Sequence, residues 1–232
     1  MTVQAAKLGI LMLDTQFPRI VGDVGNPASF AFGVRYHSVK GATPAAIVEG
    51  DQTPFVDAFI AAGRALLAEG CTGIATTCGF LSLRRQQFAD ALGVPVAASA
   101  LEQLGLVNAN LPGNRRAGVL TISAHSLSAD HLRLAGAPAD TPVEGMEGTH
   151  FADAILQNRP DLDVDRARSE MVARAVAFAR SRPDLGALVL ECTNMPPYAD
   201  DISAATGLPV HSIITYLGWF EAGLPAPTSG GS

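Results

Sequence analysis

An internal repeat constrains the fold of this chain more than any other feature. When the sequence is set against itself at an offset of 114 residues (192 minus 78), Cys78 falls on Cys192 and Gly93 falls on Gly207. The same offset pairs Ala91 with Ala205, Pro95 with Pro209 and Val96 with Val210. Both halves read as an apolar run, a cysteine turn, a helical pattern, a glycine and a second apolar run. We therefore treat the chain as a duplicated α/β unit with one cysteine in each half.

The order of the apolar runs predicts the fold class. Strands are expected at residues 7–13, 34–39, 73–77, 94–98, 117–122 and 187–190 and from residue 210. Helices are expected at residues 53–68, 81–92, 100–110, 127–134, 151–156, 165–182, 196–205 and 213–222. Strands that alternate with helices favour parallel sheets. We expect an α/β fold of two pseudo-symmetric lobes, each a parallel sheet flanked by helices, with the active site in the cleft between them. Lobe one would comprise residues 1–98 plus 210–232, and lobe two residues 99–209.

Charge and composition exclude several classes of partner. The net charge is −6 and the basic residues do not cluster, which argues against nucleic acid or an anionic membrane surface. No apolar stretch approaches the roughly 18 residues of a membrane span, and Met1 to Lys7 lacks the pattern of a secretory signal. Three cysteines, an odd number, favour reduced thiols. We expect a cytoplasmic protein with neither membrane nor nucleic acid as partner.

Cys78 and Cys192 are the candidate catalytic residues. Each follows a strand run, and ligands of open parallel sheets bind beyond the carboxyl ends of the strands. Each also precedes a helical pattern, and a helix N-terminus lowers a thiol pKa and attracts a carboxylate. If the halves pack about a pseudo-twofold axis, the two thiols face one cleft, where one removes a proton from a carbon and the other returns one from behind. Cys71 has no counterpart and is expected to be a buried structural residue.

The sequence predicts chemistry without a cofactor. The two lysines, Lys7 and Lys40, lie outside the cysteine turns, so a pyridoxal Schiff base is not expected. Glycine-rich dinucleotide or phosphate-binding strings are missing, as are Cys-x-x-Cys pairs and clustered histidines. We expect neither a cofactor nor a metal, and a small carboxylate-containing molecule as the substrate.

The chain resembles the aspartate/glutamate racemase superfamily in three features. These are the two cysteine turns, the duplicated α/β unit and the string Glu-Cys-Thr-Asn-Met-Pro-Pro-Tyr at 191–198. Within it, the segments 8–14, 22–30, 191–198 and 205–210 resemble the algal dimethylsulfoniopropionate lyases. The resemblance implies that Cys78 and Cys192 form an acid/base pair, that groups after each cysteine hold a carboxylate, and that the protein is a homodimer.

The motifs also depart from those of other branches. Glutamate racemases carry Asn-Thr after the first cysteine and Thr-His after the second, whereas this chain has Gly79-Phe80 and Thr193-Asn194. Specificity for glutamate therefore does not follow. Arylmalonate decarboxylases keep one cysteine, which disfavours that activity.

Further side chains are candidates for the substrate site. Asp14 ends the first strand and is a candidate to bind an ammonium group or to orient a thiol; an ordinary loop carboxylate is the alternative. A solvated loop residue is likewise the alternative for His125. The candidate substrate-binding residues are Asp14, Ser29, Thr77, Gly79, Phe80, Ser123, His125, Thr193 and Asn194.

Three functions are compatible with these features. The first is a cofactor-independent racemase or epimerase of amino acids, acting at the carbon α to a carboxylate. The second is a dimethylsulfoniopropionate lyase, which forms acrylate and dimethyl sulfide by β-elimination. Its sulfonium would require an aromatic cage, drawn from Phe17, Phe30, Phe32, Tyr36 or Tyr198. The third is a ligand-binding protein without catalytic activity, which the presence of both thiols argues against.

Overall fold

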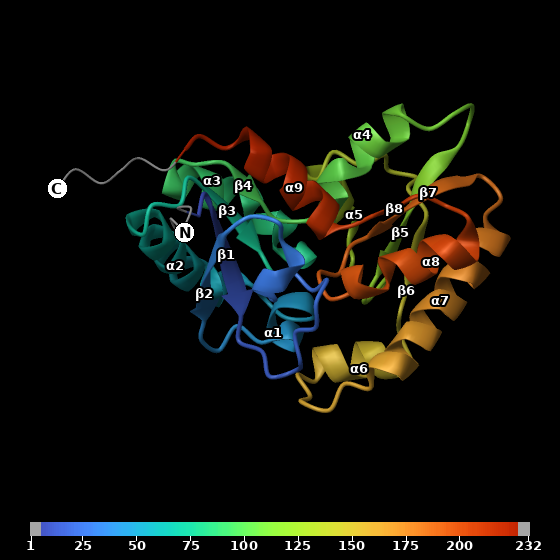
Figure 1. Cartoon of the computed structure of the whole chain (residues 1–232), viewed down its shortest axis with the longest axis horizontal. Helices are drawn as coiled ribbons and strands as arrows, with labels where there is room; N and C mark the ends of the chain where they lie inside the picture. Colours follow the sequence, from blue (N-terminus) through green and yellow to red (C-terminus); the bar gives the residue numbers. More distant parts are fainter. Residues whose placement is uncertain (1–5, 227–232) are drawn as a thin grey trace.

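Two four-stranded parallel sheets form the centres of two lobes (Figure 1). The computed structural model describes residues 6–226. The strand order is β2-β1-β3-β4 in the first sheet and β6-β5-β7-β8 in the second, so the second sheet repeats the order of the first. The strands are β1 (Leu8–Leu13), β2 (Val34–Val39), β3 (Gly73–Thr76), β4 (Val96–Ala97), β5 (Arg116–Thr121), β6 (Val143–Gly145), β7 (Leu185–Leu190) and β8 (Val210–His211). The predicted α/β fold of two lobes is confirmed.

Helices connect the strands and flank the sheets in both lobes (Figure 1). The α-helices are α1 (Pro44–Val48), α2 (Val56–Ala68), α3 (Arg85–Leu92), α4 (Leu104–Ala109), α5 (Ala129–Leu134), α6 (His150–Leu156), α7 (Val164–Ser181), α8 (Ala199–Thr206) and α9 (Ile213–Gly223). Five 3-10 helices are also present, η1 (Pro27–Ser29), η2 (Thr53–Phe55), η3 (Gly79–Arg84), η4 (Ala100–Gln103) and η5 (Pro196–Tyr198). Within residues 6–226, no helix combines the length and the apolar character that crossing a bilayer requires.

The glycines of the repeat end equivalent helices. Gly93 follows α3 with φ of 68°, and Gly207 follows α8 with φ of 69°. This left-handed conformation is accessible to glycine at little cost, and it stops a helix so that the chain can turn into the next strand. The glycine followed by an apolar run, which recurs in the sequence, therefore corresponds to the end of a helix and the start of the next strand. That strand is β4 in one lobe and β8 in the other.

The segment after each cysteine differs from the predicted α-helix. Cys78 leads into η3, where the amide of Leu81 bonds the carbonyl of Cys78 at 3.1 Å. This bond spans three residues, so the chain winds more tightly than an α-helix there. Cys192 is followed by a turn, and helical structure begins only at Pro196. The predicted strand at 94–98 is shorter, and the three-residue strand β6 and the short helix α1 were not predicted.

One helix from each half of the chain contacts the other lobe. Strand β8 pairs with β7 in the second sheet, although the expected boundary at residue 210 assigned it to lobe one. Helix α9 then returns to the first lobe, where Glu221 forms an ion pair with Lys7 at 3.0 Å. In the opposite direction, Asn108 of α4 accepts a hydrogen bond from the amide of Ala117 on β5 at 2.8 Å. Residues 1–5 and 227–232 of the expected lobes lie outside the described residues.

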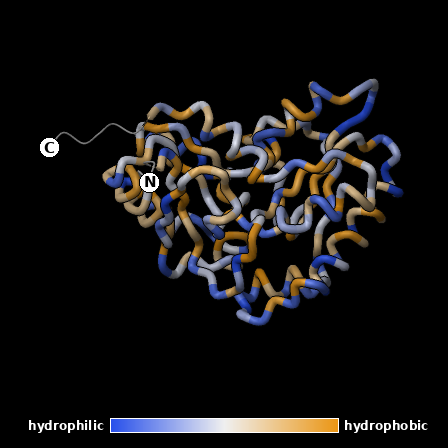
Figure 2. Tube along the Cα trace, viewed as in Figure 1, coloured by the Kyte–Doolittle hydropathy of each residue, from blue (hydrophilic) through white to orange (hydrophobic). Residues whose placement is uncertain are grey.

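The strands carry the core of each lobe. All six residues of β7 are buried, and so are five of the six residues of β1. Hydrophobic residues follow the strands in the middle of each lobe, and hydrophilic residues are frequent on the peripheral turns (Figure 2). Strands covered on both faces are typical of parallel sheets, and they leave the carboxyl ends of the strands as the place where polar groups can meet.

Candidate active site

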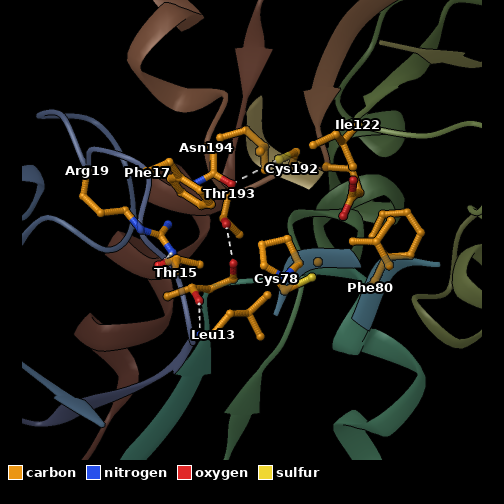
Figure 3. Close-up of a pocket in the computed structure, with 16 residues that line it drawn as sticks. Leu13, Thr15, Phe17, Arg19, Cys78, Phe80, Ile122, Cys192, Thr193 and Asn194 are labelled. Carbon is orange, nitrogen blue, oxygen red and sulfur yellow. Dashed lines mark hydrogen bonds between the residues drawn. The ribbon is translucent and has the colours of Figure 1, made fainter. Parts of the chain in front are cut away.

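A pocket lies between the lobes at the carboxyl ends of the central strands (Figure 3). It encloses about 330 Å³ of empty space, including its opening. Cys78 reaches it from the turn after β3, and Cys192 from the turn after β7. The structure thus brings both cysteines of the repeat to one pocket. The residues that line it are Leu13, Thr15, Phe17, Arg19, Pro44, Val48, Thr77, Cys78, Gly79, Phe80, Ile122, Ile155, Glu191, Cys192, Thr193 and Asn194.

Hydrogen bonds of the Thr77 and Thr193 hydroxyl groups hold the two cysteine turns in position. The hydroxyl of Thr193 donates a hydrogen bond to the carbonyl oxygen of Thr77 at 2.6 Å, from one lobe to the other. The hydroxyl oxygen of Thr77 accepts from the amide of Leu13 at 3.0 Å (Figure 3). Because the proton of Thr193 is already committed, this hydroxyl does not donate to a substrate in the present arrangement. The hydroxyl proton of Thr77 remains available for a further partner.

Burial dominates the electrostatics of the thiols. Cys78 is 7% exposed and Cys192 is 6% exposed. Desolvation is the larger cause of the shifts and the charge of Glu191 is the second. Together they raise the pKa of Cys78 to about 12 and the pKa of Cys192 well above its ordinary value. The predicted lowering of the thiol pKa is therefore wrong for this structure. Desolvation disfavours the thiolate, and the turns lack the α-helix N-termini that would favour it.

The two thiols have different hydrogen-bond partners. The backbone amides of Phe80 and Leu81 oppose part of the rise in the pKa of Cys78. Cys192 Sγ donates to Asn194 Oδ1 at 3.6 Å. The backbone amide of Asn194 opposes part of the rise in the pKa of Cys192. Amides that follow each cysteine therefore favour its thiolate.

Asn194 links Cys192 to the long loop between β1 and β2. Its Nδ2 donates to Asp23 Oδ2 at 2.6 Å, and Asp23 Oδ1 accepts from Arg19 Nη1 at 2.9 Å. Arg19 also donates to Thr15 Oγ1 at 3.0 Å, and its guanidinium lies 4.5 Å from the ring centroid of Phe17. Of the sixteen lining residues, Arg19 is the one with a cationic side chain. Arg19 was not among the residues predicted from the sequence; its position in a long loop after a strand end was the available signal.

Glu191 lies between the two cysteine turns and is fully buried. Its Oε2 accepts a hydrogen bond from Thr121 Oγ1 at 2.7 Å, whereas its Oε1 has no partner among residues 6–226. Burial raises the pKa of this carboxyl to about 7, and the bonds from Thr121 and the amide of Ile122 oppose the rise. Glu191 was not among the site residues predicted from the sequence. Its signal was an acidic residue directly after a six-residue apolar strand.

Several predicted site residues lie outside the pocket. Asp14 Oδ2 accepts from the amide of Gly41 at 2.9 Å. Ser29 donates to the carbonyl of Asp23 at 2.6 Å and so stabilises the long loop. Ser123 bonds Ser126 at 3.1 Å. His125 lines a separate crevice, whose other residues include Gln52, Arg84 and His131.

The aromatic residues divide in the same way. Phe17 lines the pocket, and Phe80, named for its amide, also contributes its ring. The hydroxyl of Tyr36 donates to the carbonyl of Val24 at 3.0 Å, and Tyr198 is buried against Phe151. These two residues, Phe30 and Phe32 are not lining residues. Within residues 6–226, no three His, Cys, Asp or Glu side chains are grouped so that they could hold a metal ion.

The chain is similar in sequence to curated dimethylsulfoniopropionate lyases. The lyase of Durusdinium sp. clade D is 28% identical over 229 residues, which cover 95% of this chain and 76% of the relative. Lyase 7 of Emiliania huxleyi (strain CCMP1516) is 29% identical over 228 residues, 94% of this chain and 67% of the relative. Lyase 5 of the same strain is 32% identical over 221 residues, 90% of this chain but 43% of the relative. No family model matches the chain.

Solved structures with the same fold include racemases and a decarboxylase. Allantoin racemase from Pseudomonas fluorescens superposes with a TM-score of 0.62 at 17% identity, covering 96% of this chain and 94% of the racemase. Arylmalonate decarboxylase gives 0.60 at 15% identity, with 97% and 94% covered. Glutamate racemase from Francisella tularensis subsp. tularensis SCHU S4 gives 0.58 at 13% identity, with 97% and 85% covered. The predicted resemblance to the aspartate/glutamate racemase superfamily and to its algal lyase branch is confirmed.

Proposed function

We propose that this protein is a cofactor-independent enzyme that removes a proton from the carbon α to a carboxylate. We further propose that it acts as a carbon–sulfur lyase on dimethylsulfoniopropionate or a close analogue, and releases acrylate and dimethyl sulfide. The names of the curated relatives support the lyase, and the shared fold supports chemistry at a carbon acid. The sequence favoured a racemase over a lyase. The apolar and aromatic side chains that line the pocket instead favour the lyase.

The observation that carries the lyase proposal is the mixture of apolar, aromatic and cationic groups around the thiols. Seven of the sixteen lining residues are apolar or aromatic side chains: Leu13, Phe17, Pro44, Val48, Phe80, Ile122 and Ile155. A dimethylsulfonium group has no N–H donor and favours aromatic and apolar surroundings. The ammonium group of an amino acid needs hydrogen-bond acceptors instead. The candidate acceptor Asp14 lies outside this pocket, bonded to Gly41. The carboxyl that lines the pocket, Glu191, is fully buried with its Oε1 oxygen directed at Gly79.

Different residues of the pocket have different roles in the elimination. Arg19 supplies a positive charge for the substrate carboxylate. Cys78 is the better site for a thiolate, because the amides of both Phe80 and Leu81 oppose the rise in its pKa, whereas the amide of Asn194 alone does so at Cys192. In the reaction, this thiolate takes the proton from Cα, the C–H electron pair forms the Cα–Cβ double bond, and the Cβ–S bond breaks with its pair on sulfur. Acrylate and neutral dimethyl sulfide leave, and the thiol proton returns to solvent.

Racemisation is the second candidate, and the position of Cys192 favours it. Cys192 is the counterpart of Cys78 in the repeat, and its S–H donates to Asn194, so it is held as an acid in the same pocket as the base. A racemase requires such an acid to return a proton from the other face. Elimination of a neutral sulfide does not require it.

One experiment separates these functions. The purified protein is incubated in deuterated water with dimethylsulfoniopropionate, with amino acids and with hydantoins, and the mixtures are followed by proton NMR. Acrylate and dimethyl sulfide formed at a rate that Cys78→Ala abolishes would support the lyase. Exchange at Cα without loss of sulfide would support the racemase. A protein that binds these compounds without exchange or product would contradict both proposals.

A further inference from the structure

The two cysteine turns differ in the residue that precedes the cysteine. At the 114-residue offset, Glu191 is the counterpart of Thr77. Both side chains accept a hydrogen bond from the end of the central strand of their own lobe. Thr77 Oγ1 accepts from the amide of Leu13, and Glu191 Oε2 accepts from the hydroxyl of Thr121. The same structural position therefore holds a hydroxyl in one lobe and a carboxyl in the other, which makes the two thiols inequivalent.

The free oxygen of Glu191 is directed at the Cys78 turn. An ideal Cβ on Gly79, the residue bonded to Cys78, would lie 2.2 Å from Glu191 Oε1. This oxygen is buried and has no hydrogen-bond partner among residues 6–226. A buried carboxylate without a full set of partners is costly, and a glutamine or a leucine would fill the same space at lower cost. A carboxyl at this position points to a role that requires its proton.

We propose that Glu191 and Cys78, which line the same pocket, hold one proton and one negative charge between them, so that Glu191 takes up a proton through the pocket when the Cys78 thiolate forms. This inference rests on the proposed two-cysteine chemistry and adds the source of the reactive thiolate. The S–H bond of Cys78 breaks and leaves its electron pair on sulfur, while an O–H bond forms on the Glu191 carboxylate. The negative charge moves from oxygen to sulfur, and the net charge of the site does not change.

The surroundings of Glu191 favour such sharing. Thr121, the last residue of β5, and the amide of Ile122 after it face Glu191. The charge of Glu191 acts on the thiols of Cys78 and Cys192. Arg19, the cationic side chain that lines the pocket, is bonded to Asp23 in the absence of substrate. A second negative charge in this buried volume is therefore disfavoured. Burial places the pKa of Glu191 near 7, so the carboxylate that receives the proton is present at neutral pH.

Alkylation of Cys78 in the absence of substrate tests the proposal. The full chain carries Cys71→Ser and Cys192→Ser, so that Cys78 alone reacts with iodoacetamide, and the rate is measured from pH 5.5 to 9. With Glu191 present, we expect the logarithm of the rate to rise with pH and then to bend to a shallower slope near pH 7. With Glu191→Gln, we expect no bend and a rise of about tenfold per pH unit, as for an isolated thiol.

Two further variants complete the test. Thr121→Val removes the donor to Glu191 Oε2 and should move the bend to higher pH, which keeps the test decisive if Glu191→Gln fails to fold. Glu69→Gln, an exposed partner of Arg35, should leave the bend in place. A bend that persists in Glu191→Gln, or one that Thr121→Val leaves unmoved, would overturn the inference. Because the measurement uses no substrate, its result is independent of whether the lyase or the racemase proposal holds.

Discussion

The hydroxyl of Thr193 donates a hydrogen bond to the backbone carbonyl of Thr77 across the two lobes, at 2.6 Å. Each of these threonines is bonded directly to a cysteine of the pocket. The bond therefore sets the relative position of two turns that are far apart in the sequence and that carry the two thiols.

Replacing Thr193 with valine should weaken both folding and turnover. The carbonyl of Thr77 would be left unpaired in a buried position, which costs about 1–3 kcal/mol of unfolding free energy. The thiols would also lose their alignment, so kcat should fall. Urea unfolding and steady-state kinetics measure the two effects. Thr206→Val, which removes a bond within α8, is the control and should leave kcat unchanged.

Gly79→Ala should be strongly destabilising for a steric reason. The new Cβ would lie 2.2 Å from Glu191 Oε1 and 2.7 Å from the backbone oxygen of Glu191, so one turn must move. Overpacking of this kind costs about 1–3 kcal/mol. Gly218→Ala in α9 is the matched control, because nothing lies within 4 Å of its added Cβ. Thermal unfolding should show a lower Tm for Gly79→Ala alone; equal Tm values would contradict the close approach.

The three cysteines should differ in their effect on turnover. Cys78→Ala should lower kcat by about 10²–10⁴-fold, as expected for loss of a positioned base. Cys71→Ala should retain activity, because Cys71 lies outside the pocket. If the enzyme is a racemase, Cys192→Ala should lose exchange on one enantiomer and keep it on the other. Full racemisation by either single variant of the pair would contradict the two-base scheme.

Arg19→Gln should weaken substrate binding more than it lowers kcat. A charge-assisted hydrogen bond contributes about 1.5–3 kcal/mol, which corresponds to roughly a tenfold or greater rise in KM for a carboxylate substrate. Arg35→Gln, which removes an exposed partner of Glu69, is the control and should leave KM unchanged. An unaltered KM in Arg19→Gln would show that another group holds the carboxylate.

Glu191 should make the folded state less stable as the pH rises through neutrality. Burial raises its pKa from 4.5 to about 7, so the folded state holds a proton that the unfolded state has released. The stabilisation is complete below the unfolded pKa and is lost as the pH rises through the folded pKa. The loss between pH 4.5 and 7 is on the order of 3 kcal/mol. Urea unfolding at pH 5 and pH 8 should show this loss in the wild type and a smaller one in Glu191→Gln.

The sequence alone determined the architecture and the two central residues of the site. Apolar runs and helix-stopping glycines act over a few residues, so the strands and the stops at Gly93 and Gly207 could be read locally. The repeat placed Cys78 and Cys192 at equivalent strand ends of the two lobes, and packing of the lobes about a pseudo-twofold axis brings these ends to one cleft. Strand β6 was missed because it is three residues long and half-buried, which leaves too short a pattern to detect.

Only the tertiary structure decided which polar side chains reach the thiols and what surrounds them. Asp14 and Arg19 lie in the same loop, yet Asp14 bonds Gly41 while Arg19 lines the pocket. The direction of the thiol pKa shifts and the isolation of Glu191 Oε1 depend on how completely two distant segments exclude water when they pack together. Desolvation depends on which atoms surround a group in the folded protein. The spacing of residues along the chain does not reveal which atoms those are.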